Sequence, residues 1–192
     1  MTAPGNALAV IEVSSLARGY VILDTLVKRA RVSVLWHREL SPGKSVIVFG
    51  GEEEATLEAH RAGLAASTTT LLDDLLLPQA HPLLWDALAG RFAPRPGDAA
   101  GIVEVATVAS TLLAADAALK TTPVGLARLR LAAGIGGRGL FVLAGPLDEI
   151  QAAAAAARDV VKPERLVGCE VVTHPHAEVW GFYCDETPPL GR

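Results

Sequence analysis

The spacing of apolar positions changes period along the first part of the chain, and each change predicts a different element. Residues 7–13 form a short apolar run with one polar break, which is typical of a strand. Two serines follow, and after them the apolar positions recur at helical spacing: Leu16, Tyr20, Leu23, Leu26 and Val27. Because serine is a favoured N-cap residue, this pattern predicts a strand followed by a helix that begins after Ser15.

The next segment has the pattern of a hairpin. Residues 32–36 and 45–49 are rich in β-branched and aromatic side chains, and they flank the turn Ser41-Pro42-Gly43. After Gly50-Gly51 come three glutamates, which suit the positive end of a helix that we expect to run to about Ala62. A short strand and a short helix at residues 82–88 complete the pattern, so the predicted class is α+β.

The second half of the chain repeats the first. Ile11-Glu12-Val13 returns as Val103-Glu104-Val105, and Asp24 and Lys28 return as Asp116 and Lys120, always 92 residues later. Gly43-Lys44 corresponds to Gly137-Arg138 at a spacing of 94, and His81 and Trp85 correspond to His176 and Trp180 at 95. Since the correspondence holds in register along the chain, one fold is used twice.

The boundary between the copies is predicted from turn-forming residues. The stretch from Arg91 to Asp98 holds two prolines and a glycine, which oppose the continuation of a helix or a strand. We therefore expect a first domain at residues 1–92, a linker at 93–98 and a second domain at 99–192. Each domain lies within the ordinary size range of a small domain.

Charge and hydropathy exclude several classes of partner. The net charge is −4 and lysines and arginines do not cluster, which argues against binding of nucleic acid. The sequence has neither an apolar stretch of about 18 residues nor a charged and then apolar leader, so we expect no membrane span and no secretory signal. The two cysteines, Cys169 and Cys184, lack the spacing of a metal site.

Three patterns that could carry chemistry have simpler explanations. Residues 134–139 spell G-x-G-x-x-G, but a strand-like run follows where dinucleotide binding needs a helix. His174-x-His176 beside the cysteines suggests zinc, yet the histidine repeated as His81 and His176 is better explained by packing or capping. Glu12 and Glu104 suit a structural hydrogen bond or a subunit contact better than acid catalysis. We therefore expect a protein that is not an enzyme.

Several of these features together resemble one family. The strand with its glutamate, the helix closing on Asp24-x-x-x-Lys28-x-Ala30, the hairpin, and the apolar strand ending in Gly50-Gly51 are similar to the bacterial microcompartment (BMC) shell domain. Both copies carry this pattern over about residues 7–180. The chain thus resembles the tandem-domain shell proteins, and its loops are most similar to the propanediol-utilisation type.

The resemblance implies two ferredoxin-like BMC domains and a homotrimer that forms a pseudohexameric tile with a central pore. Such tiles pack edge to edge with other shell proteins around encapsulated enzymes, in the cytoplasm. The resemblance places ten residues of the hairpin loops at the pore: Leu40, Ser41, Pro42, Gly43, Lys44, Gly134, Ile135, Gly136, Gly137 and Arg138. Six cations per trimer, from Lys44 and Arg138, would favour small polar or anionic metabolites. Ordinary exposed turns, with the cations on the tile face, are the alternative interpretation.

The resemblance also implies which residues lie at the tile edge. Lys28 and Lys120 match the family's edge lysine, although solvated lysines that complement the helix dipole would have the same sequence. Gln79 and His174 stand where the family has an edge arginine, so we expect an altered contact.

The Ser41 position bears on a cofactor. In the propanediol-type relative a cysteine at this position binds an iron–sulfur cluster. Serine is a poor ligand for such a cluster, so we expect no cofactor.

A second hypothesis of a different class stays open at this point. A trimer of duplicated ferredoxin-like domains could be a sensor or regulator that binds a small molecule. The tile predicts hexagonal plates or incorporation into shells, whereas the sensor predicts a discrete oligomer with a saturable ligand.

Overall fold

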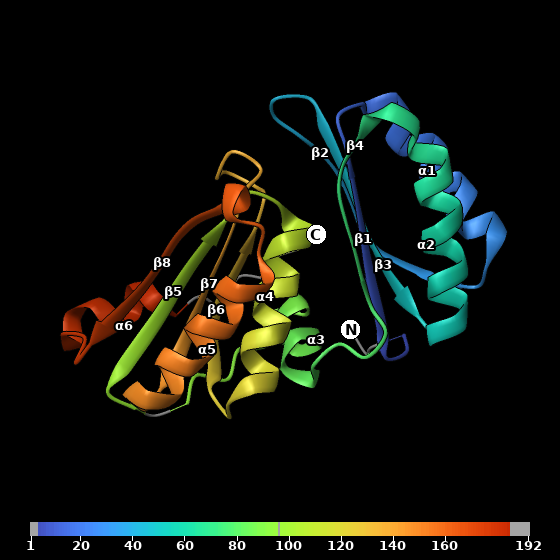
Figure 1. Cartoon of the computed structure of the whole chain (residues 1–192). Helices are drawn as coiled ribbons and strands as arrows, with labels where there is room; N and C mark the ends of the chain where they lie inside the picture. Colours follow the sequence, from blue (N-terminus) through green and yellow to red (C-terminus); the bar gives the residue numbers. More distant parts are fainter. Residues whose placement is uncertain (1–3, 96, 185–192) are drawn as a thin grey trace. The chain divides into compact units, whose positions relative to one another are not determined.

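The computed structural model describes residues 4–95 and 97–184. Pro96 of the predicted linker and the outer ends of both predicted domains, residues 1–3 and 185–192, lie outside the described residues. The structure separates into two compact units (Figure 1). Unit 1 holds the chain up to Ala80 together with Thr107–Ala109 and Ala132–Gly137, and unit 2 holds the remainder.

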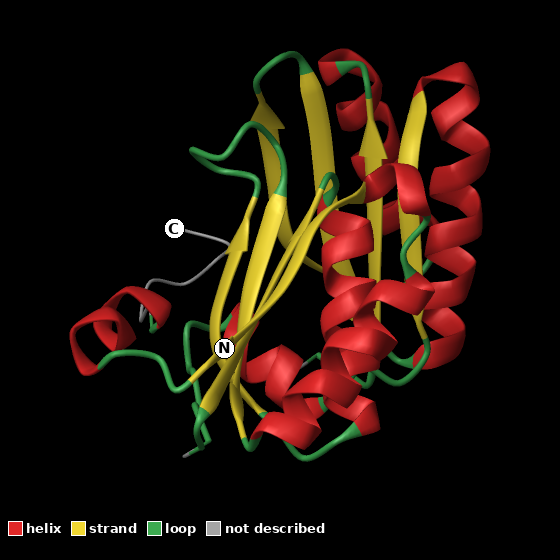
Figure 2. Ribbon diagram, turned by 60° about the vertical axis from the view of Figure 1, so that its left-hand side comes forward, coloured by secondary structure: helices red, strands yellow, loops and turns green. Residues whose placement is uncertain are grey.

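Unit 1 is an antiparallel sheet with two long helices. Its strand order is β2-β3-β1-β4. Helices α1 and α2 pack against each other, and α2 lies on β1. Figure 2 shows the strands of each unit as one layer with helices against it. The elements are β1 (Ala7–Val13), α1 (Leu16–Arg29), β2 (Ser33–Leu40), β3 (Lys44–Gly51), α2 (Glu53–Ser67), a 3-10 turn (Thr68–Thr70) and β4 (Leu71–Leu77).

The first elements form where the sequence predicts them. The Ser15 hydroxyl accepts a hydrogen bond from the Arg18 backbone N–H at 3.2 Å, which caps α1 as expected. Helix α2 begins with glutamates in its first turn but runs past the predicted end to Ser67. The extension keeps apolar residues on the sheet, and Gly63 lets α2 approach Ile11 closely. Eight buried side chains form the core: Ala9, Ile11, Val13, Ile22, Leu26, Ile47, Phe49 and Ala59.

Unit 2 repeats this plan. Its strand order is β6-β7-β5-β8, and α5 packs on β5 and β8. Its elements are α3 (Pro82–Leu88), β5 (Ala99–Val105), α4 (Val108–Thr121), β6 (Gly125–Leu131), β7 (Gly139–Gly145), α5 (Leu147–Val160), a 3-10 turn (Pro163–Arg165), β8 (Leu166–Thr173) and α6 (Ala177–Tyr183).

The two sheets share their irregularities as well as their order. The pairing of β1 with β4 shifts register between Glu12 and Val13, and that of β5 with β8 shifts between Glu104 and Val105. Because the same irregularity occurs at the matching position of both copies, it belongs to the fold of the repeated unit. The predicted α+β class and the predicted duplication are confirmed.

The sequence copies and the compact units do not coincide. Helix α3 follows β4 in the chain, as α6 follows β8, yet α3 belongs to unit 2 because it packs against β6. Conversely, the first residues of α4 and the loop after β6 belong to unit 1. Each copy therefore completes its fold with a piece from the other. Within the described residues, every helix is too short or too polar to cross a membrane.

Candidate functional site

The two loops predicted to line a pore have the backbone of tight glycine turns. The β2–β3 turn closes with a hydrogen bond of 2.8 Å from the Gly43 N–H to the Leu40 carbonyl, and Gly43 has φ +88°. In the loop between β6 and β7, Gly134, Gly136 and Gly137 have φ between +65° and +76°. Glycine reaches this region without the steric cost that other residues incur, so these turns need glycine where it occurs.

The structure brings these loops together in unit 1. The Lys44 ammonium donates a hydrogen bond of 2.9 Å to the Gly137 carbonyl. A cavity of about 390 Å³ lies between the loops. It is lined by Arg38, Glu39, Leu40, Ser41, Ala132, Ala133, Gly134, Gly136 and Gly137. Of the ten predicted pore residues, Pro42, Gly43, Lys44, Ile135 and Arg138 are not in that lining. The position of either loop around a pore stays a prediction.

Lys44 forms a buried ion pair at the base of this site. Its Nζ lies 2.6 Å from Glu12 Oε2, and the Glu12 side chain is fully buried. The other oxygen, Oε1, accepts a hydrogen bond of 2.7 Å from the backbone N–H of Ala109, in the first turn of α4. Burial raises the pKa of the Glu12 carboxyl, although the Lys44 ammonium opposes this shift. The predicted structural hydrogen bond of this glutamate is confirmed.

Arg138 makes the corresponding pair in the second copy. Its Nη1 lies 2.7 Å from Glu104 Oε1, but both side chains are partly exposed. Because each cation is paired with a carboxylate, Lys44 and Arg138 do not add unopposed positive charge at the loops. The expected preference for anions therefore loses its electrostatic basis. Opposite charges at matched positions of both copies were the signal in the sequence that could have revealed these pairs.

A second acidic group binds next to the same end of α4, and the sequence analysis did not predict it. The Thr107 hydroxyl donates a hydrogen bond of 2.5 Å to Asp73 Oδ2, from β4. Asp73 is buried, and it lies next to Glu12 in the pairing of β1 with β4. Two carboxylates thus approach the N-terminal turn of α4, where the helix dipole favours negative charge.

The predicted edge residues lie at the surface of their units. Lys28 Nζ and Lys120 Nζ each lie 2.6 Å from the aspartate one turn earlier, Asp24 and Asp116. The Lys28–Asp24 pair is exposed on both sides, and an exposed pair of this kind contributes only about 0.3–0.5 kcal/mol, so stability does not explain why this lysine is repeated. Gln79 and His174 are exposed in the turns after β4 and β8. Their role at an edge stays a prediction.

The repeated histidines are helix caps, as predicted. His81 Nδ1 accepts a hydrogen bond of 3.2 Å from the Leu83 N–H, and His176 Nδ1 accepts one of 3.3 Å from the Glu178 N–H. Burial lowers the pKa of His81, which favours the neutral ring that can accept this bond. Over residues 4–95 and 97–184, no three His, Cys, Asp or Glu side chains are grouped to hold a metal ion.

Two further sequence patterns concern cofactors. The glycine-rich run at residues 134–139 leads into β7, and α5 begins only at Leu147, so the run does not open a helix as a dinucleotide site requires. Ser41 offers a hydroxyl where an iron–sulfur cluster needs a thiolate, so the β2–β3 loop does not fit that group.

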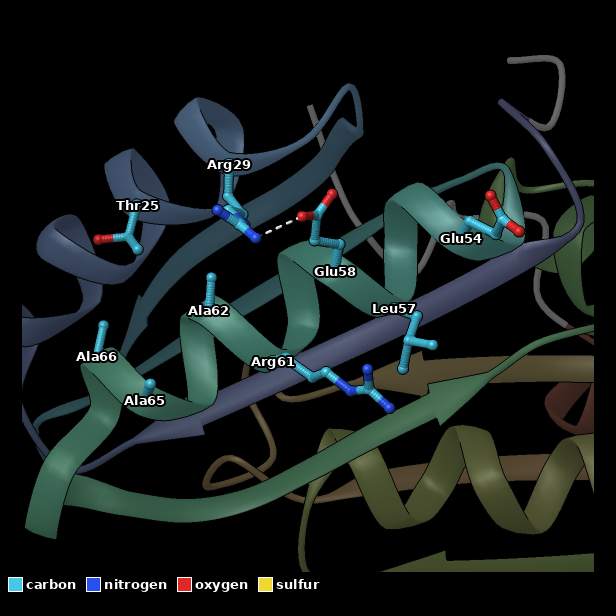
Figure 3. A pocket seen from close by; sticks show the side chains of 9 residues that line it. All are labelled: Thr25, Arg29, Glu54, Leu57, Glu58, Arg61, Ala62, Ala65 and Ala66. Carbon is cyan, nitrogen blue, oxygen red and sulfur yellow. Dashed lines mark ion pairs between the residues drawn. The ribbon is translucent and has the colours of Figure 1, made fainter.

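A shallow groove runs between α1 and α2 (Figure 3). Its volume is about 820 Å³, and alanines such as Ala62 and Ala66 line its floor. Arg29 and Glu58 reach across it and form an ion pair of 2.6 Å. The charges at its rim therefore compensate one another.

The first helices of the two copies differ sharply in burial. On α1, 55% of Tyr20 and 46% of Val27 are exposed, whereas their counterparts on α4, Leu112 and Leu119, are 0% and 4% exposed. The Asp24 side chain is 59% exposed and that of Asp116 only 5%. The same face of the same helix is thus covered in one copy and open in the other.

Comparisons with known proteins agree with this architecture. The BMC domain model matches residues 7–80 and 99–175. Over 176 residues the chain is 33% identical to the bacterial microcompartment shell protein PduT of Citrobacter freundii, covering 91% of this chain and 96% of that protein.

Solved structures give the same result. A microcompartment protein from Desulfitobacterium hafniense superposes with a TM-score of 0.79 at 31% identity, over 91% of this chain and 97% of the other. A fused permuted hexameric shell protein of the RMM microcompartment shares the fold, with a TM-score of 0.60 at 24% identity over 80% and 82% of the two chains. The chain therefore belongs to the BMC domain family and carries its domain in two tandem copies.

Proposed function

We propose that this protein is a structural tile of a bacterial microcompartment shell in the cytoplasm. Three copies of the chain close into a ring of six BMC domains, and the ring meets other shell proteins at its edges. The family match and the likeness to shell proteins over nine-tenths of the chain support this proposal. No comparison favours the alternative of a sensor, and the shell role needs no catalysis by the chain.

The observation that carries the trimer is the unequal burial of α1 and α4. Because the copies share one fold, a surface that is covered on α4 has its counterpart on α1, where Tyr20 and Val27 are exposed. A second copy of the chain supplies the missing cover. Such a head-to-tail contact repeats until the ring closes, which leaves no growing end.

The repeat also gives the contacts expected across this interface. Glu12 accepts a hydrogen bond from the Ala109 N–H, and the matching pair is Glu104 and Ala17. In the ring, Glu104 of one protomer would therefore accept from Ala17 of the next. Arg138, now paired with Glu104, would stand in the place of Lys44.

In such a ring the β2–β3 and β6–β7 loops lie at the pore, and Lys28 and Lys120 lie at the edge of the tile. Lys120 supports the edge role, because it stays 46% exposed although Asp116 beside it is buried. Since the cations of both loops are paired, the pore suits small polar metabolites without a strong preference for charge.

Charges placed on the open face of α1 test the trimer. We expect Tyr20→Asp together with Val27→Asp to convert trimers into monomers, because two carboxylates would have to be buried without partners. Native mass spectrometry of the variant and the unchanged protein measures this. Val160→Asp, at an exposed apolar position near the end of α5, is the matched control and should leave the trimer intact. Trimers that persist in the double variant would refute this interface.

Removal of both lysines tests the tile edge separately. Lys28→Ala with Lys120→Ala should leave the trimer intact but weaken the assembly of sheets or shells, because it acts outside the ring interface. Electron microscopy of the assembled protein, at equal concentrations of variant and unchanged chain, shows the difference. Arg61→Ala, which removes an exposed cation from α2, serves as the control. Sheets of unchanged extent in the lysine variant would overturn the edge assignment.

A further inference from the structure

Helices α3 and α6 are counterparts in the two copies, and they are docked in different ways. The backbone N–H of His81, the N-cap of α3, donates a hydrogen bond of 2.8 Å to Asp116 Oδ1 on α4. Helix α3 packs against β6, and its Leu84 and Ala87 are fully buried. The helix that ends the first copy is therefore fixed on the first helix and the outer strand of the second copy.

Helix α6 instead lies on the sheet of its own copy. Trp180 and Tyr183 pack against Ala100, Ala127, Val142 and Ala144. Arg128 Nη1 donates a hydrogen bond of 2.6 Å to the Phe182 carbonyl. Figure 1 shows α6 at the left, beside the strands of unit 2.

This position leaves the apolar residues of α6 uncovered. None of its residues is fully buried. Phe182 is 73% exposed, whereas its counterpart Ala87 is 0% exposed, and Val179 is also exposed where Leu84 is buried. The significant feature is the difference between the copies: the positions of Val179 and Phe182 are exposed on α6, and the same two positions are buried on α3.

The surface that matches the α3 docking site is open in unit 1. The counterpart of Asp116 is Asp24, whose side chain is mostly exposed. The counterpart of Leu126, at the start of β6, is Val34 on β2, which is 38% exposed against 1% for Leu126. Unit 1 thus has an exposed carboxylate at the position that binds α3 in unit 2, and an exposed apolar residue on the strand that corresponds to β6.

We propose that α6 docks on α1 and β2 of a second copy of this chain, in the way that α3 docks on α4 and β6. The His176 backbone N–H then donates to Asp24 of the neighbouring protomer, and Val179 and Phe182 are buried near Val34. The position on its own sheet is that of the unassembled chain, so α6 is an arm that is exchanged when the ring closes. This inference rests on the proposed trimer.

A disulfide between the two anchor positions tests the exchange. In a Cys169→Ser, Cys184→Ser background, His176→Cys is combined with Asp24→Cys, and the oxidised protein is analysed by denaturing electrophoresis. The His81 N–H lies 2.8 Å from Asp116 Oδ1, so the two residues are direct neighbours, as the residues joined by a disulfide must be. We expect covalent dimers and trimers that disappear on reduction. His81→Cys with Asp116→Cys is the matched control, which should cross-link within one chain and run as a monomer.

A second pair of cysteines detects the position of α6 on the sheet of its own copy. Tyr183→Cys with Ala127→Cys, in the same background, should form little disulfide in trimers isolated before oxidation. Native mass spectrometry of each variant establishes whether the trimer exists. Intact trimers that form the Tyr183–Ala127 disulfide in full and give no cross-link between positions 176 and 24 would overturn the exchange but not the proposed function. Absence of trimers from the unchanged protein would overturn both.

Discussion

Replacement of Gly19 by threonine is expected to destabilise unit 1 by about 2–3 kcal/mol, the upper range for overpacking of a core. Gly19 is buried on α1, and a Cβ at this position would lie 2.1 Å from the Ser45 hydroxyl and 2.6 Å from the Ser45 Cβ. The helix can accept the side chain only by moving away from β3. Urea unfolding followed by the fluorescence of Trp36 measures the loss, in a Trp85→Phe, Trp180→Phe background.

The second copy contains the compensating residues, so a second substitution in unit 1 should restore the stability that Gly19→Thr removes. There the helix carries Thr111 and the strand carries Gly139, whose Cβ would lie 2.1 Å from the Thr111 hydroxyl. Gly19→Thr combined with Ser45→Gly reproduces that arrangement and should recover more than half of the lost stability. Gly168→Thr is the control, because that position has open space. All unfolding is measured at one chain concentration, since assembly adds to stability. If the double variant loses the sum of the two single losses, then Ser45→Gly does not compensate for Gly19→Thr, which would contradict this explanation.

Replacement of Lys44 by methionine is expected to cost about 3–5 kcal/mol, as for a buried charge that loses its partner. The Glu12 carboxylate would keep the Ala109 N–H but lose the ammonium 2.6 Å away. The matched substitution Arg138→Met should cost about 1 kcal/mol or less, because the pair with Glu104 is partly exposed. Equal losses for the two variants would show that burial does not govern these pairs.

The Lys44→Met variant should regain stability as the pH falls. Burial already raises the pKa of Glu12 above 4.5 in the folded protein, and loss of Lys44 removes the interaction that lowers it. The folded state then binds a proton that the unfolded state releases, so stability rises as the pH falls from the raised value towards 4.5. Urea midpoints of the variant and the unchanged protein between pH 7 and about 5 should converge, and a constant difference would exclude Glu12 as the cause.

Local signals in the sequence predicted most of each copy. Two serines placed the start of α1, the acidic run placed the start of α2, and glycines placed the turns of both hairpins. These features act over a few residues, so a single copy contains all the information that they need. Because the two copies align in register, the same elements could be predicted for the second copy, including the histidine caps.

The sequence did not predict which pieces are exchanged between the copies. Helix α3 has the same kind of histidine cap as α6, but it packs on β6, a strand some forty residues further along the chain. The pair of Lys44 with Glu12 was likewise missed, since the prediction treated the loops as exposed and gave their cations no partners. Whether a residue is buried by a segment that is distant in the sequence depends on the tertiary structure, so local sequence patterns do not predict it.

Native mass spectrometry of the unchanged protein tests the central claim most directly. We expect a single main species with three times the chain mass of 20.0 kDa, because the open face of α1 is covered only when the ring closes. A protein that remains monomeric at micromolar concentration, with Tyr20 and Val27 still accessible to solvent, would contradict it.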